Sequence, residues 1–459
     1  MSFPKYEAYQ DSGVEWLGEV PEHWSVEPLK YHAQVFPSNV DKKTYEGQAQ
    51  IHLCNYTDVY YNDEIIEGMN FMPATATEEQ IDKFSLRAGD VIFTKDSETA
   101  NDIAIAAYVP RNLPGVICGY HLSMVRSNTT VDGAFIKRFF DSRSAKAYFE
   151  VSANGLTRVG LGQYATDNIP TPVPPLKEQT QISRFLDHET ARIDTLIAEQ
   201  QRLIELLKEK RQAVISHAVT KGLDPTAPLK DSGVEWLGEV PAHWEVGSLG
   251  YYSKIDTGAT PDRSKPEYWN GDVPWIKTGE VKYETIFQAE EYISIEGVNN
   301  SAARIAPKGT LLMAMYGQGV TRGRVAILNI DAAYNQACAG ISVEPQLQVR
   351  FLRDYLMAAY PYIRDDGNET SQMNLSSGYI AKIKVTVPPI QEQMTISDFI
   401  ERETEKFDSL ISEATSVAVL LQERRSALIS AAVTGKIDVR DWQAPASASP
   451  APTLEPVHG

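Results

Sequence analysis

The segment DSGVEWLGEVP occurs twice in this chain of 459 residues, at Asp11–Pro21 and, letter for letter, at Asp231–Pro241. After one changed residue, each copy continues into a His-Trp pair, His23–Trp24 and His243–Trp244. Repeats at a fixed spacing govern the architecture of a chain, so this duplication constrains the fold more than any other feature. It predicts two related halves, and the length of the chain also exceeds that of one ordinary core.

Each framing strip (residues 11–24 and 231–244) is followed by a long block and then by a second repeated segment. PPLKEQTQISRFLDHETARIDTLIAEQ, which begins at Pro174, aligns with PPIQEQMTISDFIERETEKFDSLISEA, which begins at Pro388. The strips repeat after 220 residues and these segments after 214, so the second block is six residues shorter than the first. The order of strip, variable block and repeated segment therefore occurs twice, with blocks at about 25–172 and 245–387.

Each repeated segment has the pattern of a long helix. No Gly or Pro occurs from Leu176 to Thr220, and apolar residues recur every seven residues, with Gln200 in one of these positions. Such a repeat predicts helix-on-helix packing with a supercoil, and about 42 residues at roughly 1.5 Å each form a rod of roughly 60 Å. One block cannot bury a rod of this length, so the two helices are expected to pack on each other. The predicted seam is Leu186, Ile193, Leu207 and Val214 in the first helix (173–222) and Ile400, Phe407, Ala414, Leu421 and Leu428 in the second (388–436). It is widened by Leu196, Leu203, Ile197 and Ile204 in the first helix and by Leu410, Val417 and Ile411 in the second.

The variable blocks have the pattern of mixed α/β domains. Short apolar runs after glycine turns predict strands, and apolar residues at helical spacing predict helices. The predicted strands are Ala88–Lys95 and Asn101–Val109 in the first block and Lys308–Met315 and Thr321–Leu328 in the second. The predicted helices are Phe135–Glu150 and Val349–Ile363. The blocks are therefore expected to share a topology although their sequences differ, whereas the Pro/Ala-rich residues 443–459 are expected to be disordered.

Composition limits the class of protein. The mean hydropathy of -0.30 fits a soluble globular protein, no apolar run is long enough to span a membrane, and the first residues lack a signal-peptide pattern. The cysteines Cys54, Cys118 and Cys338 are single and widely spaced, which fits buried residues in a reducing cytoplasm and argues against a disulfide framework or a zinc site. The net charge of -18 argues against a general nucleic-acid coat protein, although local patches of Lys and Arg can still bind phosphate.

Candidate catalytic sites are weak in this sequence. The loop YGQGVTRG at Tyr316–Gly323 resembles a nucleotide-binding loop, but its glycines miss the dinucleotide spacing. It also leads into a predicted strand, which offers no helix dipole to a phosphate, so a loop joining two strands is the simpler interpretation. A magnesium-dependent nuclease is an alternative, in which Asp272 and Glu280 would hold the ion and Lys282 would polarise a phosphate. Such groupings recur by chance, and the sequence predicts no metal site.

Planar and basic side chains gather on predicted loops of both blocks and indicate a DNA-binding surface. Arginine can bind guanine through two hydrogen bonds, asparagine and glutamine can bind adenine similarly, and lysine or threonine can anchor a phosphate. In the first block the candidates are Lys95, Ser97, Tyr120, His121 and Arg158. In the second block they are Lys277, Thr278, Tyr316, Arg322, Arg324, Asn335 and Gln336. For each residue taken singly, a solvated charged loop is the alternative interpretation.

The duplicated DSGVEWLGEVPxHW strip, the PPLKEQ and PPIQEQ helix starts and the AVTKGLD and AVTGKID helix ends together resemble the specificity subunit of type I restriction-modification systems. The resemblance covers nearly the whole chain. It implies two target recognition domains of mixed α/β structure, 11–172 and 231–387, each of which reads one half of a split double-stranded DNA site. It further implies that the two long helices form an antiparallel coiled coil in a pseudo-twofold internal repeat, set the distance between the two halves of the site and help to hold two methylation subunits.

The resemblance also implies where the chemistry lies. Methyl transfer from S-adenosylmethionine to adenine, and cleavage that depends on ATP and Mg²⁺, are expected on methylation subunits and translocating restriction subunits. This chain is therefore expected to hold no cofactor, to contact no membrane and to be no enzyme by itself. Two alternatives remain, the nuclease built on Asp272, Glu280 and Lys282 and a helical scaffold that binds proteins but no DNA.

Under this interpretation the framing strip marks where a block joins the helices. Its Asp11 and Glu15 resemble catalytic carboxylates when one copy is considered alone, but the repetition favours a structural role. His23 and His243 are interpreted as packed structural residues. The predicted packing anchors are Trp16, Trp236, Trp24 and Trp244.

Overall fold

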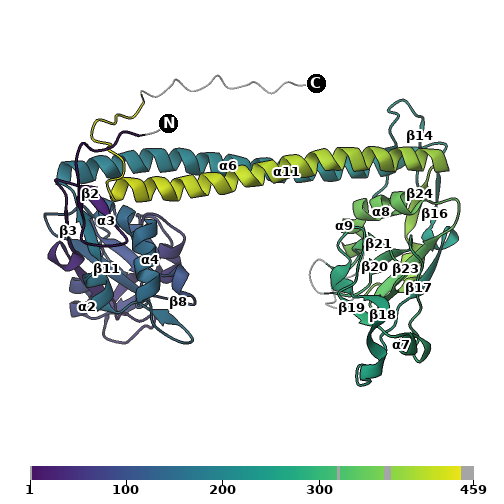
Figure 1. Ribbon diagram of the computed structural model, residues 1–459, viewed down its shortest axis with the longest axis horizontal. Coiled ribbons are helices and arrows are strands. Elements are labelled where there is room, and N and C mark those ends of the chain that lie inside the picture. Colours follow the sequence, from purple (N-terminus) through teal and green to yellow (C-terminus); the bar gives the residue numbers. More distant parts are fainter. Residues whose placement is uncertain (1–2, 318–320, 366–373, 446–459) are drawn as a thin grey trace. The chain divides into compact units, whose positions relative to one another are not determined.

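Two long helices dominate the computed structural model, which describes residues 3–317, 321–365 and 374–445 (Figure 1). They are α6 (Leu176–Lys221, 46 residues) and α11 (Ile390–Val433, 44 residues). Each begins directly after a Pro-Pro pair, because proline is tolerated where the first N–H groups of a helix have no internal acceptor. Each ends close to a glycine in the left-handed region, Gly222 (φ 76°) or Gly435 (φ 70°), as is common at helix C-termini. No helix in the described part of the chain is long and apolar enough to cross a membrane.

The chain divides into two units, and each contains one half of both helices. Unit 1 comprises Met1–Gln200 and Ser416–Gly459, and unit 2 comprises Gln201–Thr415. In unit 1, Asp194 of α6 pairs with Arg425 (2.8 Å), while Gln181, earlier in α6, donates a hydrogen bond to the carbonyl of Val439 (3.1 Å), later in the chain. In unit 2, Arg211 pairs with Asp408 (2.9 Å). Residue numbers therefore rise along one helix as they fall along the other, so the helices are antiparallel, as expected.

The apolar seam of the helices is buried at five of the predicted positions and half-buried at the other four. In unit 1 the predicted seam residues Leu186, Ile193 and Leu428 are buried, as are Ile400 and Ala414 in unit 2. The remaining predicted seam residues are half-buried, namely Leu207, Val214, Phe407 and Leu421. Four of the seven residues predicted to widen the seam are exposed, so this part of the prediction is wrong, namely Leu196 (43%), Leu203 (43%), Leu410 (47%) and Val417 (43%). The other three, Ile197, Ile204 and Ile411, are half-buried, as expected for residues that flank the seam. One residue along a helix turns the side chain by about 100°, which is enough to move it from the seam to the surface.

Each unit contains a four-stranded antiparallel sheet with the same strand order, as the repeat predicts. In unit 1 the order is β4 (Ala33–Pro37), β11 (Leu122–Ser127), β7 (Val91–Thr94) and β9 (Ala106–Tyr108). In unit 2 it is β17 (Ser253–Thr257), β23 (Cys338–Val343), β20 (Leu311–Ala314) and β21 (Val325–Ile327). The third strand in each order, β7 (VIFT) or β20 (LLMA), is buried at every position because both faces of the sheet are covered.

A mixed three-stranded sheet packs beside each four-stranded sheet. Its central strand pairs with one neighbour in parallel and with the other antiparallel in both units. The strands are β10 (Val116–Cys118), β5 (Ala49–Cys54) and β6 (Met72–Ala76) in unit 1 and β22 (Ala333–Tyr334), β18 (Trp269–Ile276) and β19 (Glu291–Ile293) in unit 2. All three cysteines are free and buried. Cys54 and Cys118 lie in the three-stranded sheet of unit 1, and Cys338 lies in β23 of the four-stranded sheet of unit 2.

Each predicted block helix is two helices in the structure. Residues 135–150 contain the boundary between α3 (Gly133–Phe140) and α4 (Arg143–Ser152), where Ser142 caps α4 by accepting a hydrogen bond from the Ala145 N–H. Residues 349–363 contain the boundary between α8 (Val349–Ala358) and α9 (Tyr360–Asp365), next to a proline at the second position of α9. The apolar periodicity continues through both boundaries, so periodicity alone did not reveal them.

Short elements complete the two units. In unit 1 they are β1 (Tyr9–Asp11), β2 (Glu19–Pro21), β3 (Ser25–Pro28), α1 (Tyr56–Tyr60), α2 (Glu78–Phe84), β8 (Asp96–Ser97), β12 (Val159–Gly160), α5 (Gln163–Asp167) and β13 (Pro170–Val173). In unit 2 they are β14 (Leu229–Asp231), β15 (Glu239–Pro241), β16 (Glu245–Ser248), α7 (Ile295–Asn299), α10 (Ser377–Lys382) and β24 (Lys384–Val387). Single 3-10 turns are η1 (Leu29–Tyr31), η2 (Ala100–Asp102), η3 (Leu249–Tyr251), η4 (Pro266–Tyr268) and η5 (Thr278–Glu280). Most of the predicted tail, residues 446–459, lies outside the described residues.

The start of each long helix binds the framing strip through one carboxylate. Glu178 is 6% exposed and accepts hydrogen bonds from Trp24 Nε1 (3.0 Å), His23 Nε2 (2.8 Å) and the Tyr6 hydroxyl (2.5 Å). In unit 2, Glu392 accepts hydrogen bonds from Trp244 Nε1 (3.0 Å) and His243 Nε2 (2.8 Å). Trp24 and Trp244 are buried and thus have the packing role predicted for them, whereas His23 and His243 contact the carboxylates but are 41% and 48% exposed and are therefore not packed as predicted.

The next residue of each helix binds the variable block. Gln179 donates to the carbonyls of Thr130 (3.1 Å) and Pro174 (2.7 Å) and accepts from the Asp132 N–H (2.8 Å). Its counterpart Gln393 makes the same set of contacts with main-chain groups of residues 346, 348 and 388. Both glutamines are fully buried, and the repeated Glu-Gln pair therefore joins strip, block and helix in each unit.

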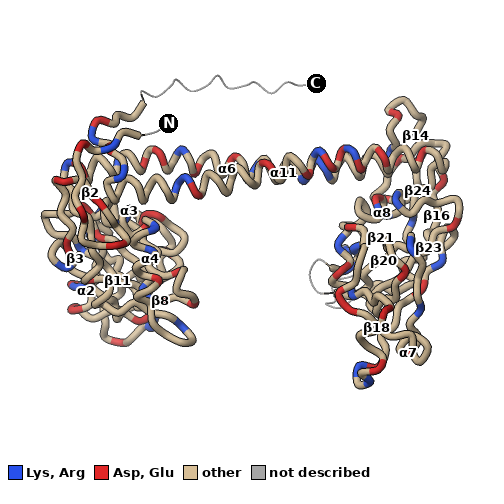
Figure 2. Tube along the Cα trace, in the orientation of Figure 1, with Lys and Arg blue, Asp and Glu red and all other residues tan. Residues whose placement is uncertain are grey.

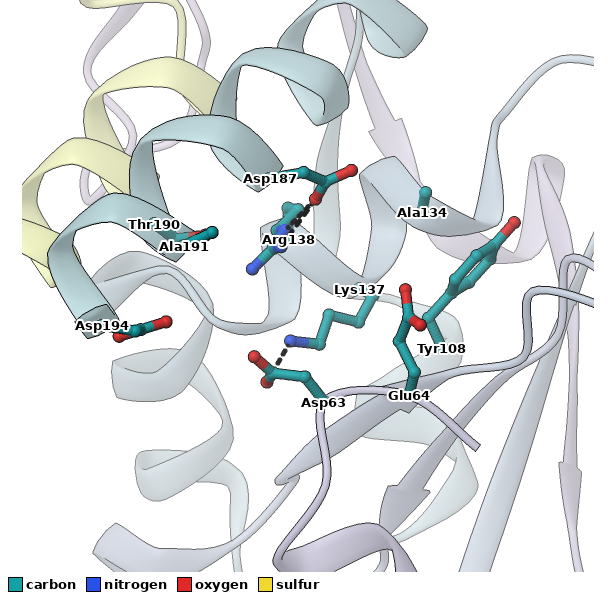
Figure 3. Close-up of a pocket in the computed structure, with 10 residues that line it drawn as sticks. All are labelled: Asp63, Glu64, Tyr108, Ala134, Lys137, Arg138, Asp187, Thr190, Ala191 and Asp194. Atoms are coloured by element: carbon teal, nitrogen blue, oxygen red, sulfur yellow. Dashed lines mark hydrogen bonds and ion pairs between the residues drawn. The ribbon is translucent and has the colours of Figure 1, made fainter. Parts of the chain in front are cut away.

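Ion pairs between α3 and α6 also attach the first block to the helices. Lys137 is 3% exposed and lies 2.6 Å from Asp63 and 2.8 Å from Asp141. Arg138 reaches Asp187 of α6 at 2.6 Å. Asp63, Lys137, Arg138 and Asp187 line a polar pocket of about 330 Å³, shown in Figure 3, where Lys137 faces Asp63 and Arg138 faces the helix. The contact of Arg138 with Asp187 fixes how the block meets α6, whereas Asp63 and Asp141 are the anionic partners that the buried lysine requires.

Candidate nucleic-acid interface

The five predicted DNA-binding residues of the first block converge at one edge of the four-stranded sheet. Lys95 directly follows β7, and its N–H bonds to the carbonyl of His121 just before β11. The short strand β8, which contains Ser97, pairs with β12 next to Arg158. Segments separated by more than sixty residues thus meet here because antiparallel pairing of β7 with β11 and of β8 with β12 brings their ends together.

Asp96 organises this edge, although the sequence did not single it out as a site residue. Its carboxylate lies 2.8 Å from His121 Nδ1 and 2.7 Å from Arg158 Nη2. Lys95 donates to the carbonyl of Ser38 (2.7 Å), and its ammonium lies 4.6 Å from the ring centre of Tyr120. Burial lowers the pKa of the Lys95 ammonium. The edge therefore presents cations beside an aromatic ring that is 52% exposed, an arrangement suited to phosphates and bases.

Two tyrosines extend the aromatic surface of this edge. Tyr56 and Tyr60 of α1 stack with ring centres 5.4 Å apart, and Tyr60 donates a hydrogen bond to Asp102 (2.9 Å). Tyr61, the next residue, is 76% exposed. The tyrosine-rich stretch NYTDVYY was the available signal in the sequence, but aromatic residues in a run without a basic neighbour do not indicate DNA binding on their own.

The second block uses the same position of its sheet. The Met315 N–H bonds to the Ala337 carbonyl, which repeats the bond between Lys95 and His121 in the first block. The Asn335 N–H bonds to the Ile276 carbonyl, so the end of β18 joins this edge. The structure therefore brings together five predicted residues at the equivalent place, namely Lys277, Thr278, Tyr316, Asn335 and Gln336.

The side chains at this second edge differ from those at the first. Lys277 pairs with Glu290 (2.9 Å) and Glu291 (3.1 Å), and Gln336 accepts a hydrogen bond from the Thr260 hydroxyl. The sequence reasoning missed Arg263, whose guanidinium lies 3.7 Å from the ring centre of Trp269 and 2.8 Å from Glu291. A single arginine on a loop before a tryptophan carried no stronger signal than many other positions.

Arg322 and Arg324 lie on a different part of the second block. Arg322 donates to the main-chain carbonyl of Arg364 at the end of α9 (3.1 Å). Arg324 is half-buried, with its guanidinium 5.6 Å from the ring centre of Tyr283. Burial raises the pKa of the Tyr283 hydroxyl, so that ring stays neutral beside the arginine. The two arginines thus contact residues other than those that surround Lys277 and Gln336.

The residues of the alternative nuclease site have other contacts. Glu280 uses one carboxylate oxygen to accept from the Lys277 N–H (2.8 Å) and the other to accept from the Glu290 N–H (2.9 Å). Asp272 and Lys282 are exposed. Within the described residues no group of His, Cys, Asp and Glu side chains is placed to hold a metal ion. The glycine loop at 316–323 includes residues 318–320, which lie outside the described residues.

Comparisons with known proteins place the chain in a family. A family model described as the type I restriction modification DNA specificity domain matches residues 39–206 and again residues 241–414. The chain is 23% identical to the MjaX and 21% identical to the MjaVIII type I restriction enzyme specificity subunits of Methanocaldococcus jannaschii, over 92% of this chain and 96% and 95% of those proteins. It is 20% identical to the EcoKI specificity subunit of Escherichia coli, over 93% of this chain and 92% of that protein.

Solved structures share the fold. One chain of a type I restriction-modification system, solved in work on its complex assembly and conformational transition, matches with a TM-score of 0.72 at 17% identity, over 90% of this chain and 98% of that one. The HsdS subunit from Thermoanaerobacter tengcongensis matches with a TM-score of 0.54 at 16% identity, over 91% and 98%. None of these relatives supports the nuclease or scaffold alternatives. The chain belongs to the type I restriction modification DNA specificity domain family and is a DNA specificity subunit with two such domains.

Proposed function

We propose that each unit of this specificity subunit reads one half of a bipartite double-stranded DNA target through the sheet edge described above. The observation that carries this proposal is that two blocks of the same topology present different side chains at the same main-chain position, beside Lys95 in one and Met315 in the other. A shared scaffold with divergent side chains is what two different half-sites require, because base identity is read by side chains.

We further propose that α6 and α11 set the spacer between the half-sites and hold two methylation subunits. Both helices run without interruption through the two units, and each exposes leucines or valines outside its seam. Acidic residues outnumber basic residues along α11 (Figure 2), which fits a surface for partner proteins better than one for DNA. In this proposal S-adenosylmethionine, ATP and Mg²⁺ act on the methylation and restriction subunits, and the complex works in the cytoplasm.

Mapping methylated adenines in cells that carry this chain with its partner subunits tests the proposal. We expect a split target whose first half changes when residues 25–172 are exchanged for the corresponding block of a relative, while the second half and the spacer remain. Inserting seven residues into each long helix should change the spacer alone. Methylation without sequence preference, or a block exchange that changes both halves, would contradict the proposal.

A further inference from the structure

Arg158 of the first block is held differently from the lysines of the two interfaces. Its side chain is 51% exposed, yet its Nη2 lies 2.7 Å from an Asp96 carboxylate that is only 18% exposed. Lys95 is half-buried and donates a hydrogen bond to the main-chain carbonyl of Ser38. Lys277 pairs with both Glu290 and Glu291. Arg158 thus combines an exposed guanidinium with a fixed anchor at one end.

The backbone around Arg158 is also fixed. Residues 154 and 160 exchange both main-chain hydrogen bonds (3.0 and 2.9 Å), which closes a short hairpin around Arg158. Val159 and Gly160 then pair with Ser97 and Asp96 in β12 and β8. Asp96 thus lies in β8, and Arg158 directly precedes its partner strand β12, so the position of one constrains the position of the other.

We propose that Arg158 is the residue that reads a guanine in the first half-site, with Asp96 as its positioning residue; this rests on the proposed function. A guanidinium offers two parallel N–H donors that match O6 and N7 of guanine in the major groove, and this pair of bonds is the commonest base-specific contact of arginine. An anchor on one nitrogen leaves the remaining donors for the base and removes much of the cost of ordering a long side chain.

The carboxylate of Asp96 does not itself read a base. Carboxylates can accept a hydrogen bond from the N4 amino group of cytosine, but here Oδ1 contacts Arg158 and Oδ2 contacts His121 Nδ1 at 2.8 Å. The Arg158 guanidinium also offsets the negative charge that would otherwise repel DNA phosphates. The cluster of Lys95, Arg158, His121 and Asp96 therefore remains compatible with DNA.

A phosphate contact by Arg158 is the competing role, and the two roles predict different results. A phosphate contact contributes equally to every sequence and adds about one to the slope of log affinity against log salt. A base contact contributes at one position only, and losing a bidentate contact reduces discrimination there by about 10- to 100-fold.

The experiment measures binding of the complex with its methylation subunits to DNA libraries in which every position of the mapped target is varied, at several salt concentrations. We expect Arg158→Ala and Arg158→Lys each to lose about 10- to 100-fold discrimination at one G·C pair of the first half-site, with the second half-site unchanged. Lysine keeps the positive charge but lacks the two parallel N–H donors of a guanidinium. Arg158→Lys should therefore keep the salt dependence of the wild type. Asp96→Asn should lose discrimination at the same base pair while Arg158 keeps its charge.

Arg111→Ala is the matched control, because Arg111 is an exposed arginine of the same block that follows β9 and lies at the opposite end of β7 from Lys95. It should leave every base preference unchanged. A first half-site without a G·C pair, a uniform loss at all positions in Arg158→Ala, or full discrimination in Arg158→Lys would each overturn the assignment of Arg158. A wild-type complex that prefers no sequence would instead overturn the proposed function, so the two failures are distinct.

Discussion

Replacing Glu178 by glutamine should destabilise unit 1 more than replacing its counterpart Glu392 destabilises unit 2. The oxygen Oε1 of Glu178 accepts hydrogen bonds from the Tyr6 hydroxyl (2.5 Å) and Trp24 Nε1 (3.0 Å), whereas Oε1 of Glu392 accepts only the bond from Trp244 Nε1 (3.0 Å) among the described residues. Glutamine keeps the shape and one acceptor oxygen but removes the charge. The two sites therefore differ in the number of donors that the charge serves and also in burial, since Glu178 is 6% exposed and Glu392 is 29% exposed.

The magnitude follows from this count. A hydrogen bond to a charged group contributes about 1.5–3 kcal/mol and one between neutral groups about 0.5–1.5 kcal/mol, so each donor loses about 1 kcal/mol in the glutamine variant. The histidine contacts add little, because His23 and His243 are 41% and 48% exposed and solvent screens such pairs. We expect a loss of about 2 kcal/mol in Glu178→Gln and about 1 kcal/mol in Glu392→Gln.

Hydrogen–deuterium exchange of the full chain across a urea series measures the two effects separately when the strip peptides extend past the identical segments, because Glu22 then marks the peptide of β2 in unit 1 and Ala242 marks that of β15 in unit 2. A single melting temperature would mix them. The exposed carboxylates of the same strips provide the control, and Glu15→Gln and Glu235→Gln should change the opening free energy by no more than about 0.5 kcal/mol. An equal or larger loss in Glu392→Gln would refute the reasoning from donor number.

Three further perturbations test the packing, the backbone and the ion pairs of unit 1. Leu428→Ala, at a buried position of α11 (9% exposed), should cost about 2–4 kcal/mol in urea unfolding, whereas Leu420→Ala on the same helix (62% exposed) should cost less than about 0.5 kcal/mol. Gly435→Ala should lower the thermal stability by about 2 kcal/mol or more, because φ is 70° and the new Cβ would lie 2.2 Å from a proline Cδ of the strip. Burial opposes ionisation of Asp63, but Lys137 overcomes this effect and holds the carboxyl pKa below its ordinary 3.8. The stability that Asp63 contributes should therefore be complete above pH 3.8 and be lost as the pH falls through the lowered pKa, so an Asp63→Asn variant that keeps the acid sensitivity of the wild type would contradict this role.

The repeat made the architecture predictable from the sequence. Two copies of one strip and one helix pattern required two related units, and the long helix begins at Leu176, where the pattern begins. The strand Val91–Thr94 lies inside the predicted Ala88–Lys95, because a fully apolar run after a glycine turn allows few other conformations. The split of the block helices was not predicted, since Ser142 caps α4 without interrupting the apolar spacing.

The candidate interface was predictable only in part, because its residues meet through strand pairing. Lys95, Tyr120, His121 and Arg158 were predicted singly from their chemistry, and the pairing of β7 with β11 and of β8 with β12 brings them together. Asp96 looked like an ordinary loop carboxylate until the structure placed the Arg158 guanidinium and the His121 ring beside it. Arg322 and Arg324 have the same chemistry as Arg158 but lie against α9 and Tyr283, which no local pattern reveals.

In each unit the framing strip and the long helices form a frame to which the variable block is attached. The contacts between block and frame explain why blocks of different sequence can occupy the same frame. Glu178, His23 and Trp24 all belong to the frame, so their hydrogen bonds do not depend on the block. Gln179 does contact the block, but only through the Thr130 carbonyl and the Asp132 N–H, which any sequence with the same backbone provides. Each block also closes on itself, because its first and last strands pair with each other, as β3 with β13 and as β16 with β24.

Side-chain ion pairs set the remaining limit on exchange between the units. Asp187 of α6 holds Arg138 of the first block (2.6 Å), and Glu401, which is 214 residues further on, holds Arg350 of the second (2.6 Å). Both helices thus carry an acidic residue at the same position of the repeat, and an arginine of each block pairs with it. The first block also pairs with α11, because Asp63 lies 3.3 Å from Arg425. A transplanted block that keeps the backbone, the arginine and this carboxylate can therefore keep these contacts with the frame while its recognition residues change.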